Sequence, residues 1–155
     1  MVLPIVRRAY LVAAPVWVAT LPLATYAATR VHASTLADAF AFGIYAIGMV
    51  VCHQKPERSF HLWGAQLPVC ARCTGIYLGA ALGVVFRSAE ASRSAIRMRR
   101  ARVLTSRFAL VLAALPTAAT LLYEWTTGVT PANAIRFAAG LPLGAVVSWL
   151  VLQVN

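Results

Sequence analysis

The residues most able to do chemistry in this 155-residue sequence are Cys52, His53, Cys70 and Cys73. Cys52 and His53 are adjacent, and Cys70 and Cys73 follow in a Cys-x-x-Cys spacing. The odd number of thiols excludes a set of intrachain disulfides that pairs every cysteine. Three thiols and one imidazole form a ligand set for Zn²⁺, and soft thiolates also suit Cu(I). The predicted metal ligands are therefore Cys52, His53, Cys70 and Cys73.

The same thiols support two other interpretations. In the first, Cys70 and Cys73 are a redox pair and Cys52 is the resolving thiol. Residues three apart at a helix start share one face, and both the helix N-terminus and Arg72 would stabilise a thiolate there. In the second, the cysteines are small apolar residues that only pack. The sequence leaves metal binding, redox chemistry and packing open.

His61 competes with His53 as the fourth ligand. On a continuous helix the side chains of Cys52 and His53 point about 100° apart, so both reach one ion only where the helix breaks. Pro56 makes a break nearby plausible, which favours His53. A covalently attached haem is excluded, because Thr74 stands where the Cys-x-x-Cys-His motif needs its histidine.

Several polar side chains near the cysteines could orient a metal ligand or position a substrate. These candidates are Gln54, Glu57, Arg58, Gln66 and Arg72. The charges of this loop can equally be explained as solvated. Farther along the chain, Glu124 and Arg136 are expected to lie at a membrane interface and to pair with each other.

Five apolar runs must position these residues, at about 11–29, 36–52, 69–86, 108–123 and 137–154. Apolar residues make up 61% of the chain, whereas soluble domains have about 45–50%. Each run approaches or exceeds the roughly 17 residues that a membrane helix needs. The sequence predicts an all-α polytopic membrane helix bundle of about five transmembrane helices in one domain. The net charge of +10 does not indicate nucleic-acid binding, because long apolar runs separate the basic residues.

The second and third runs bring the cysteines together. Cys52 ends one run, Cys70 and Cys73 begin the next, and the loop between them lets the two helices run antiparallel. The first run has an alternative interpretation as a signal peptide, because Arg7 and Arg8 precede it.

A basic linker over residues 87–107 sets the predicted orientation. It holds seven arginines, and short basic loops stay in the cytoplasm, where they also meet anionic lipid headgroups. Counting five spans from this linker places the Cys/His loop outside, the C-terminus inside and the N-terminus outside. That count leaves Arg7 and Arg8 on the outer side of the membrane, where basic residues are less favourable than in the cytoplasm.

Glycines recur every fourth residue on two of the runs. Gly75, Gly79 and Gly83 form one row, and Gly140 and Gly144 form another. Such rows let helix backbones approach closely in lipid. They predict close packing of the third helix against a partner helix or a second copy of the chain.

Three segments of the sequence resemble the signature of the domain of unknown function 2085 family, which consists of small prokaryotic membrane proteins. The segments are Cys52-His53-Gln54, Pro56 to Phe60, and Gln66 to Tyr77. The resemblance extends from Cys52 to about Gly79 and implies an integral protein of the prokaryotic cell (inner or plasma) membrane. It brings no established activity. His61 lies outside the signature, which again favours His53.

The sequence therefore predicts a membrane protein whose outer-face Cys/His cluster binds a metal. A membrane thiol–disulfide oxidoreductase and a non-catalytic helix-packing protein are the alternatives. No hydrolase triad, phosphate loop or paired carboxylate indicates another enzyme class.

Overall fold

The computed structural model describes residues 2–30, 34–90 and 102–153, and within these ranges it contains five α-helices. They are α1 (Val2–Ala28), α2 (Thr35–Val51), α3 (Ala71–Glu90), α4 (Arg102–Thr127) and α5 (Asn133–Val151). Between α2 and α3 lie a 3-10 turn, η1 (Pro56–Arg58), and a small antiparallel hairpin of β1 (His61–Leu62) and β2 (Ala65–Gln66). The predicted all-α class is confirmed.

Of the described helices, three are long and apolar enough to cross a membrane, over Ile5–Ala28, Arg107–Thr127 and Asn133–Val151. Two shorter apolar helices cover Thr35–Val51 and Ala71–Phe86. Large apolar side chains face outward on several of these helices, and Leu36 and Val50 of α2 are 83% and 87% exposed. Because such a surface is not stable in water, the chain is a membrane protein whose outward face meets lipid.

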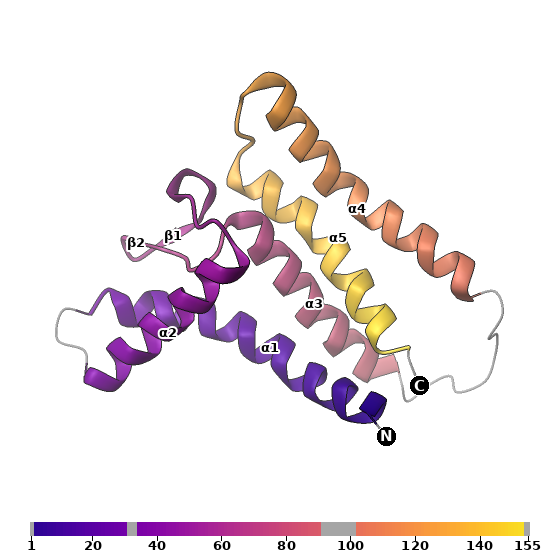
Figure 1. Cartoon of the computed structure of the whole chain (residues 1–155), viewed down its shortest axis with the longest axis horizontal. Helices are drawn as coiled ribbons and strands as arrows, with labels where there is room; N and C mark the ends of the chain where they lie inside the picture. Colours follow the sequence, from indigo (N-terminus) through magenta and orange to yellow (C-terminus); the bar gives the residue numbers. More distant parts are fainter. Residues whose placement is uncertain (1, 31–33, 91–101, 154–155) are drawn as a thin grey trace.

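The helices α3 and α5 run side by side in the same direction (Figure 1), in contact through their glycine rows. A Cβ atom at Gly75 or Gly79 would collide with the backbone carbonyl of Phe137 or Leu141, respectively. A Cβ at Gly144 would likewise collide with the carbonyl of Ile76. The predicted close packing of the third helix is confirmed, and its partner is α5 of the same chain.

The helix α1 packs along α3 in the opposite direction. The rings of Trp17 and Tyr77 meet edge to face with centroids 5.9 Å apart. Nearer the N-terminus, the hydroxyl groups of Tyr10 and Ser148 share a hydrogen bond of 2.7 Å. The N-terminal half of α1 therefore lies beside the C-terminal ends of α3 and α5, and Figure 1 shows the start of α1 close to the end of α5.

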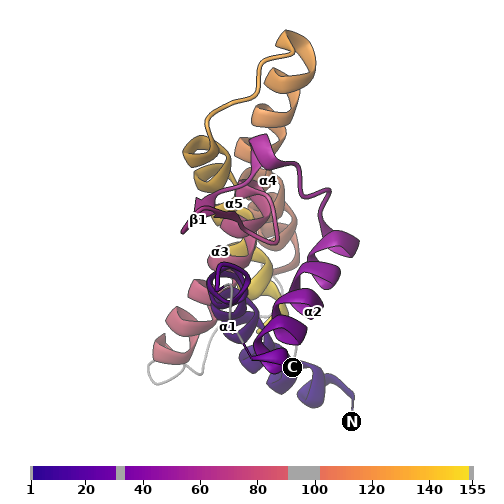
Figure 2. The same cartoon turned by 90° about the vertical axis from the view of Figure 1, so that its left-hand side faces the viewer.

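The helix α2 folds back along the last part of α1, outside the bundle of α3, α4 and α5 (Figures 1 and 2). Its C-cap residue, Cys52, joins Leu21 of α1 and Val69 in one buried cluster. The C-terminal end of α2 thus lies near the start of α3, whereas the start of α1 lies near the ends of α3 and α5. The sequence prediction of five crossings places the N-terminus outside and the C-terminus inside, whereas in the structure the start of α1 and the end of α5 lie at the same end of the bundle.

The helices also extend into the predicted basic linker at 87–107. The helix α3 continues to Glu90, and α4 begins at Arg102. Residues 91–101 of that linker lie outside the described residues.

Candidate functional site

The end of α2 and the start of α3 place the three cysteines, which we call the cysteine group (Cys52, Cys70 and Cys73). Cys52 leaves α2 in an extended conformation, Cys70 directly precedes α3, and Cys73 lies in its first turn. Their sulfur atoms all lie within 4.8 Å of one another. Gly48 permits this approach, because a Cβ atom there would collide with the carbonyl oxygen of Pro68.

All three cysteines are free thiols; Cys52 is buried, and Cys70 and Cys73 are half-buried. The backbone N–H of Cys70 donates a hydrogen bond of 3.2 Å to the sulfur of Cys52. Hydrogen bonds from the thiol groups of Cys70 and Cys73, and then from backbone N–H groups, lower the pKa of Cys52, against the opposing effect of burial. The site therefore favours a thiolate at Cys52, which is the form that binds metals and attacks disulfides.

Two glutamines that were predicted to support the site tie its loop together. Gln54 adopts a left-handed conformation with φ of 46°, and its side-chain amide donates to the carbonyls of Tyr45 (2.9 Å) and Pro68 (2.5 Å). Gln66 donates to the carbonyl of Gln54 (2.6 Å) and to the hydroxyl of Ser59 (3.2 Å). These bonds fix the segment after Cys52 relative to the segment before Cys70, so both glutamines position the cysteine group.

The structure does not bring the predicted histidine ligand into the cysteine group. Among the described residues, the sulfur atoms are the only ligand atoms in this cluster, and the side chains of both His53 and His61 are exposed. Glu57 is also exposed, with one carboxylate oxygen 3.8 Å from the Nε of Arg58. Three of the four predicted ligands thus meet, and the fourth faces solvent.

The remaining two predicted supporting residues, Arg58 and Arg72, point to a different place. Both contact the carboxylate of Glu124, at 2.8 and 3.5 Å, and Arg136 also binds it. The expected pairing of Glu124 with Arg136 is confirmed. That Arg58 and Arg72 join the pair was not predicted, although arginines beside apolar helices are themselves a signal of buried partners.

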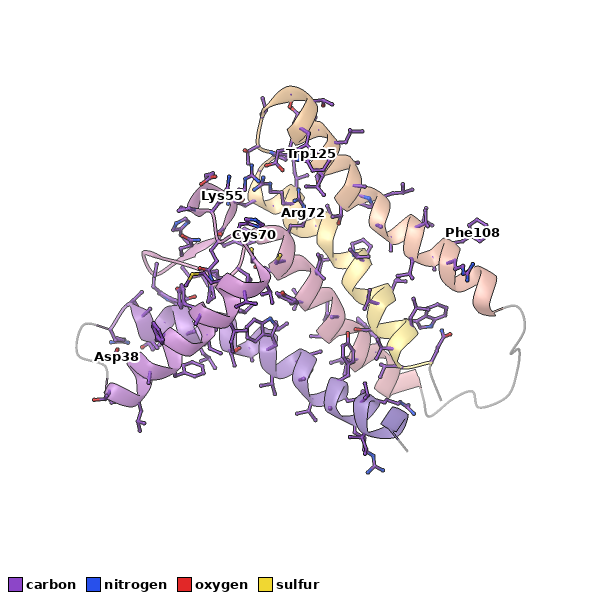
Figure 3. The ribbon with its side chains drawn as sticks, viewed as in Figure 1. Asp38, Lys55, Cys70, Arg72, Phe108 and Trp125 are labelled. Atoms are coloured by element: carbon purple, nitrogen blue, oxygen red, sulfur yellow. The ribbon has the colours of Figure 1, made fainter. Side chains whose placement is uncertain are left out.

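The cysteine group and the arginines occupy different sides of the first turn of α3. The cysteines pack against Leu21 and Trp17 of α1, whereas Arg72 donates to the hydroxyl of Thr120 on α4 at 3.1 Å. Figure 3 shows Cys70 and Arg72 at the same end of the bundle, near Lys55 of the loop. One end of the bundle thus carries two chemically distinct groups of side chains.

A family model described as "Predicted membrane protein (DUF2085)" matches residues 52–150, which include every residue of both groups. An uncharacterized protein of Methanocaldococcus jannaschii is 40% identical over 63 residues, which are 41% of this chain and 40% of that protein. An uncharacterized protein of Methanothermobacter thermautotrophicus is 36% identical over 94 residues, which are 61% of this chain and 78% of that protein. The match thus spans about two fifths of the length of the first relative. No solved structure matches the chain.

Proposed function

Because the chain belongs to the DUF2085 family of membrane proteins, and its matched region begins at Cys52, we propose that it binds a soft metal ion through the cysteine group. The observation that carries this proposal is the convergence of three sulfur atoms from two helix ends within 4.8 Å. Cysteines that only pack as small apolar residues would not be expected to converge from the two ends of this loop. Three thiolates around one point form a ligand set for Zn²⁺ or Cu(I).

The surroundings of the cysteine group support binding as thiolates. The cysteine group lies at the N-terminus of α3, which carries a positive partial charge, and the N–H of Cys70, directly before α3, donates to the sulfur of Cys52. A bound cation would then be neutralised by thiolates inside a largely apolar shell. This combination favours tight binding of a soft ion over a hard one.

With His53 facing solvent, the site has three protein ligands and one open position. Closed four-ligand zinc sites are structural, whereas an open position permits exchange of the ion or binding of a further molecule. We therefore infer an exchangeable site rather than a purely structural one. A turn of His53 inward would close it, so this histidine decides between the two forms.

We also propose how the protein lies in the membrane. The end of the bundle where α1 and α4 begin and α3 and α5 end faces the cytoplasm, and the cysteine group faces the outside. On this proposal α1, α3, α4 and α5 cross, and α2 enters the outer leaflet without crossing. Arg7 and Arg8 then join the linker arginines on the cytoplasmic side, as the positive-inside rule requires.

Elemental analysis of the full-length protein, purified from native membranes without chelator, tests the metal proposal. We expect about one Zn or Cu ion per chain, lost on chelation, with three reactive thiols afterwards. A protein without metal, whose three thiols react fully before chelation, would contradict it.

A thiol–disulfide oxidoreductase is the second candidate, and the hydrogen bond to Cys52 favours it as well, since a stabilised thiolate is the attacking species in disulfide exchange. Its signature differs from that of metal binding. Two of the three thiols would be unreactive until reductant is added, and chelation would change nothing.

A further inference from the structure

The side chains of Arg58, Arg72 and Arg136 converge on one carboxylate, that of Glu124, and we call these four residues the arginine cluster. They come from η1, α3, α5 and α4, respectively. Glu124 contacts Arg58 at 2.8 Å and Arg72 at 3.5 Å, and it is hydrogen-bonded to Arg136. The side chains of Glu124 and Arg136 are only 5% and 2% exposed, so the cluster is buried at its centre.

The charges of the arginine cluster do not balance. Three guanidinium groups carry +3 and one carboxylate carries −1, which leaves +2 among these described residues. Glu57 lies 3.8 Å from Arg58, but it is 59% exposed, so water screens most of its effect. Buried charge without a partner is costly, and the low-dielectric surroundings in a membrane protein increase the cost. A bound anion would neutralise the excess positive charge and so remove this energetic cost.

The helix ends add to the imbalance. Arg72 lies in the first turn of α3 and Arg136 in the first turn of α5, and neither of these turns contains an acidic residue. Helix N-termini carry a positive partial charge and normally attract acidic groups. Two parallel helices that begin at the same end and carry arginines in place of carboxylates concentrate positive potential there.

Hydrogen-bonding groups in the arginine cluster also remain unused. The Nε atoms of Arg58, Arg72 and Arg136 are buried and have no hydrogen-bond acceptor among the described residues. Such buried, unpaired donors are rare in folded proteins. Two buried acceptors are unpaired as well, namely Oε2 of Glu124, 3.5 Å from a terminal nitrogen of Arg72, and Oδ1 of Asn133, and neither makes a hydrogen bond with an arginine Nε. The three Nε–H groups therefore lack an acceptor that several of them could share.

We propose that the arginine cluster binds a phosphate-type oxyanion, either inorganic phosphate or the phosphate of a lipid headgroup. Guanidinium groups match phosphate and carboxylate oxygens in pairs of parallel hydrogen bonds, and a doubly charged anion neutralises the excess of +2. The anion enters beside Arg58, whose side chain is 35% exposed while that of Arg136 is 2% exposed. This site is independent of metal binding at the cysteine group.

The thermal unfolding of the purified full-length protein in an uncharged detergent tests the proposal. Inorganic phosphate should raise the Tm with saturation, at a concentration where chloride of equal ionic strength does not, because a ligand that binds the folded state stabilises it. Arg58→Gln should weaken the apparent affinity for phosphate about tenfold or more. Lys55→Gln is the matched control, since it removes one exposed positive charge from the same loop and should keep the wild-type response.

Glu124→Gln separates an anion site from a self-contained ion network. Without the carboxylate the three arginines lack their only acidic partner in the cluster, so the variant should have a lower Tm than the wild type. If the arginine cluster binds an anion, phosphate should restore this Tm more strongly than it raises that of the wild type. A loss of stability that phosphate does not repair would overturn the proposal.

The source of the phosphate is settled by lipid nanodiscs. Inorganic phosphate that raises the Tm in detergent identifies a free anion as sufficient. A rise in Tm only in nanodiscs with phosphatidylglycerol, absent in phosphatidylcholine and lost in Arg58→Gln but not in Lys55→Gln, identifies a lipid headgroup. Equal Tm values for the wild type in phosphate, chloride and both lipids would refute an anion site of either kind.

Discussion

The backbone N–H of Cys70 donates a hydrogen bond of 3.2 Å to the sulfur of Cys52, across 18 residues of chain. The bond joins the residue directly before α3 to the C-cap residue of α2. It therefore links the geometry of the cysteine group to the loop between the two helices. A change in the conformation of that loop should alter the relative positions of the three thiols.

Replacement of single cysteines tests the ligand set. Cys52→Ala, Cys70→Ala and Cys73→Ala should each lower the metal content from about one ion per chain to nearly none, because two thiolates hold a soft ion much more weakly than three. Elemental analysis after native purification measures this. A Cys70→Ala/Cys73→Ala double variant with the wild-type metal content would contradict binding at the cysteine group.

Replacement of the histidines determines whether the site has a fourth ligand. Since the side chain of His53 is exposed, we expect His53→Ala to keep its metal, as His61→Ala should. Acidification should release the ion from both variants and from the wild type, because protons compete for the thiolates. Loss of metal in His53→Ala alone would show that this histidine turns inward to complete a four-ligand site.

Gln54→Leu tests whether the loop positions the cysteine group. The change removes the donor to the carbonyls of Tyr45 and Pro68 and should lower the stability by about 1–3 kcal/mol. Metal affinity should fall by about 10–100-fold, as with other supporting residues of metal sites. Competition with a chromophoric chelator measures the affinity, with Lys55→Gln as the control in the same loop. Unchanged metal affinity in a destabilised variant would limit Gln54 to a role in folding.

Gly79→Leu tests the contact between α3 and α5. A side chain there meets backbone atoms, the carbonyl of Leu141 and the nitrogen of Ala145, which cannot move aside independently. The variant should lose about 3 kcal/mol or more, seen as a lower Tm and less folded protein. Gly43→Leu on α2 is the control, because a Cβ there meets no atom within 4 Å. Equal Tm values for the two variants would show that the glycine row is incidental.

Much of the fold follows from local patterns in the sequence. The apolar runs predict helices, because in lipid a single apolar segment can form all of its backbone hydrogen bonds only as a helix. The spacing of Cys70 and Cys73 and the period of the glycines each define one helix face without reference to the rest of the chain. These features were therefore predictable, including the tight packing of Gly75 and Gly79.

Pairings between distant segments were not predictable in the same way. The sequence of α2 does not show that the helix folds back along α1, because a largely apolar helix of 17 residues could either cross the membrane or return to the same side. The hairpin at 61–66 was also missed, since its turn places Trp63 at a φ of 52°, a conformation that a bulky residue seldom adopts. The contacts of Arg58 and Arg72 with Glu124 likewise depend on how α3, α4 and α5 assemble.

The distribution of basic residues along the chain agrees with the orientation proposed for the protein in the membrane. Of the 14 basic residues, nine are Arg7, Arg8 and the seven arginines within 87–107, and the described parts of these two segments lie at the end of the bundle where α1 begins and α3 ends. Of the other five, three belong to the arginine cluster, which leaves Arg30 and Lys55 exposed at the opposite end. This asymmetry favours a cytoplasmic location for the end with nine.

Labelling of introduced cysteines on intact cells tests this orientation and the number of crossings. With four crossings, a membrane-impermeant maleimide should reach a cysteine at Ala65 in β2, but reach one at Val6 or at Ser94 only after permeabilisation. The unmodified chain, with its own cysteines buried or half-buried, is the background. A bundle of five crossings predicts a different pattern, because it moves the N-terminus outside and exposes Val6 together with Ala65. Labelling of Ser94 but not of Ala65 would reverse the orientation, and the cysteine group would then face the reducing cytoplasm, where free thiols persist without a bound metal.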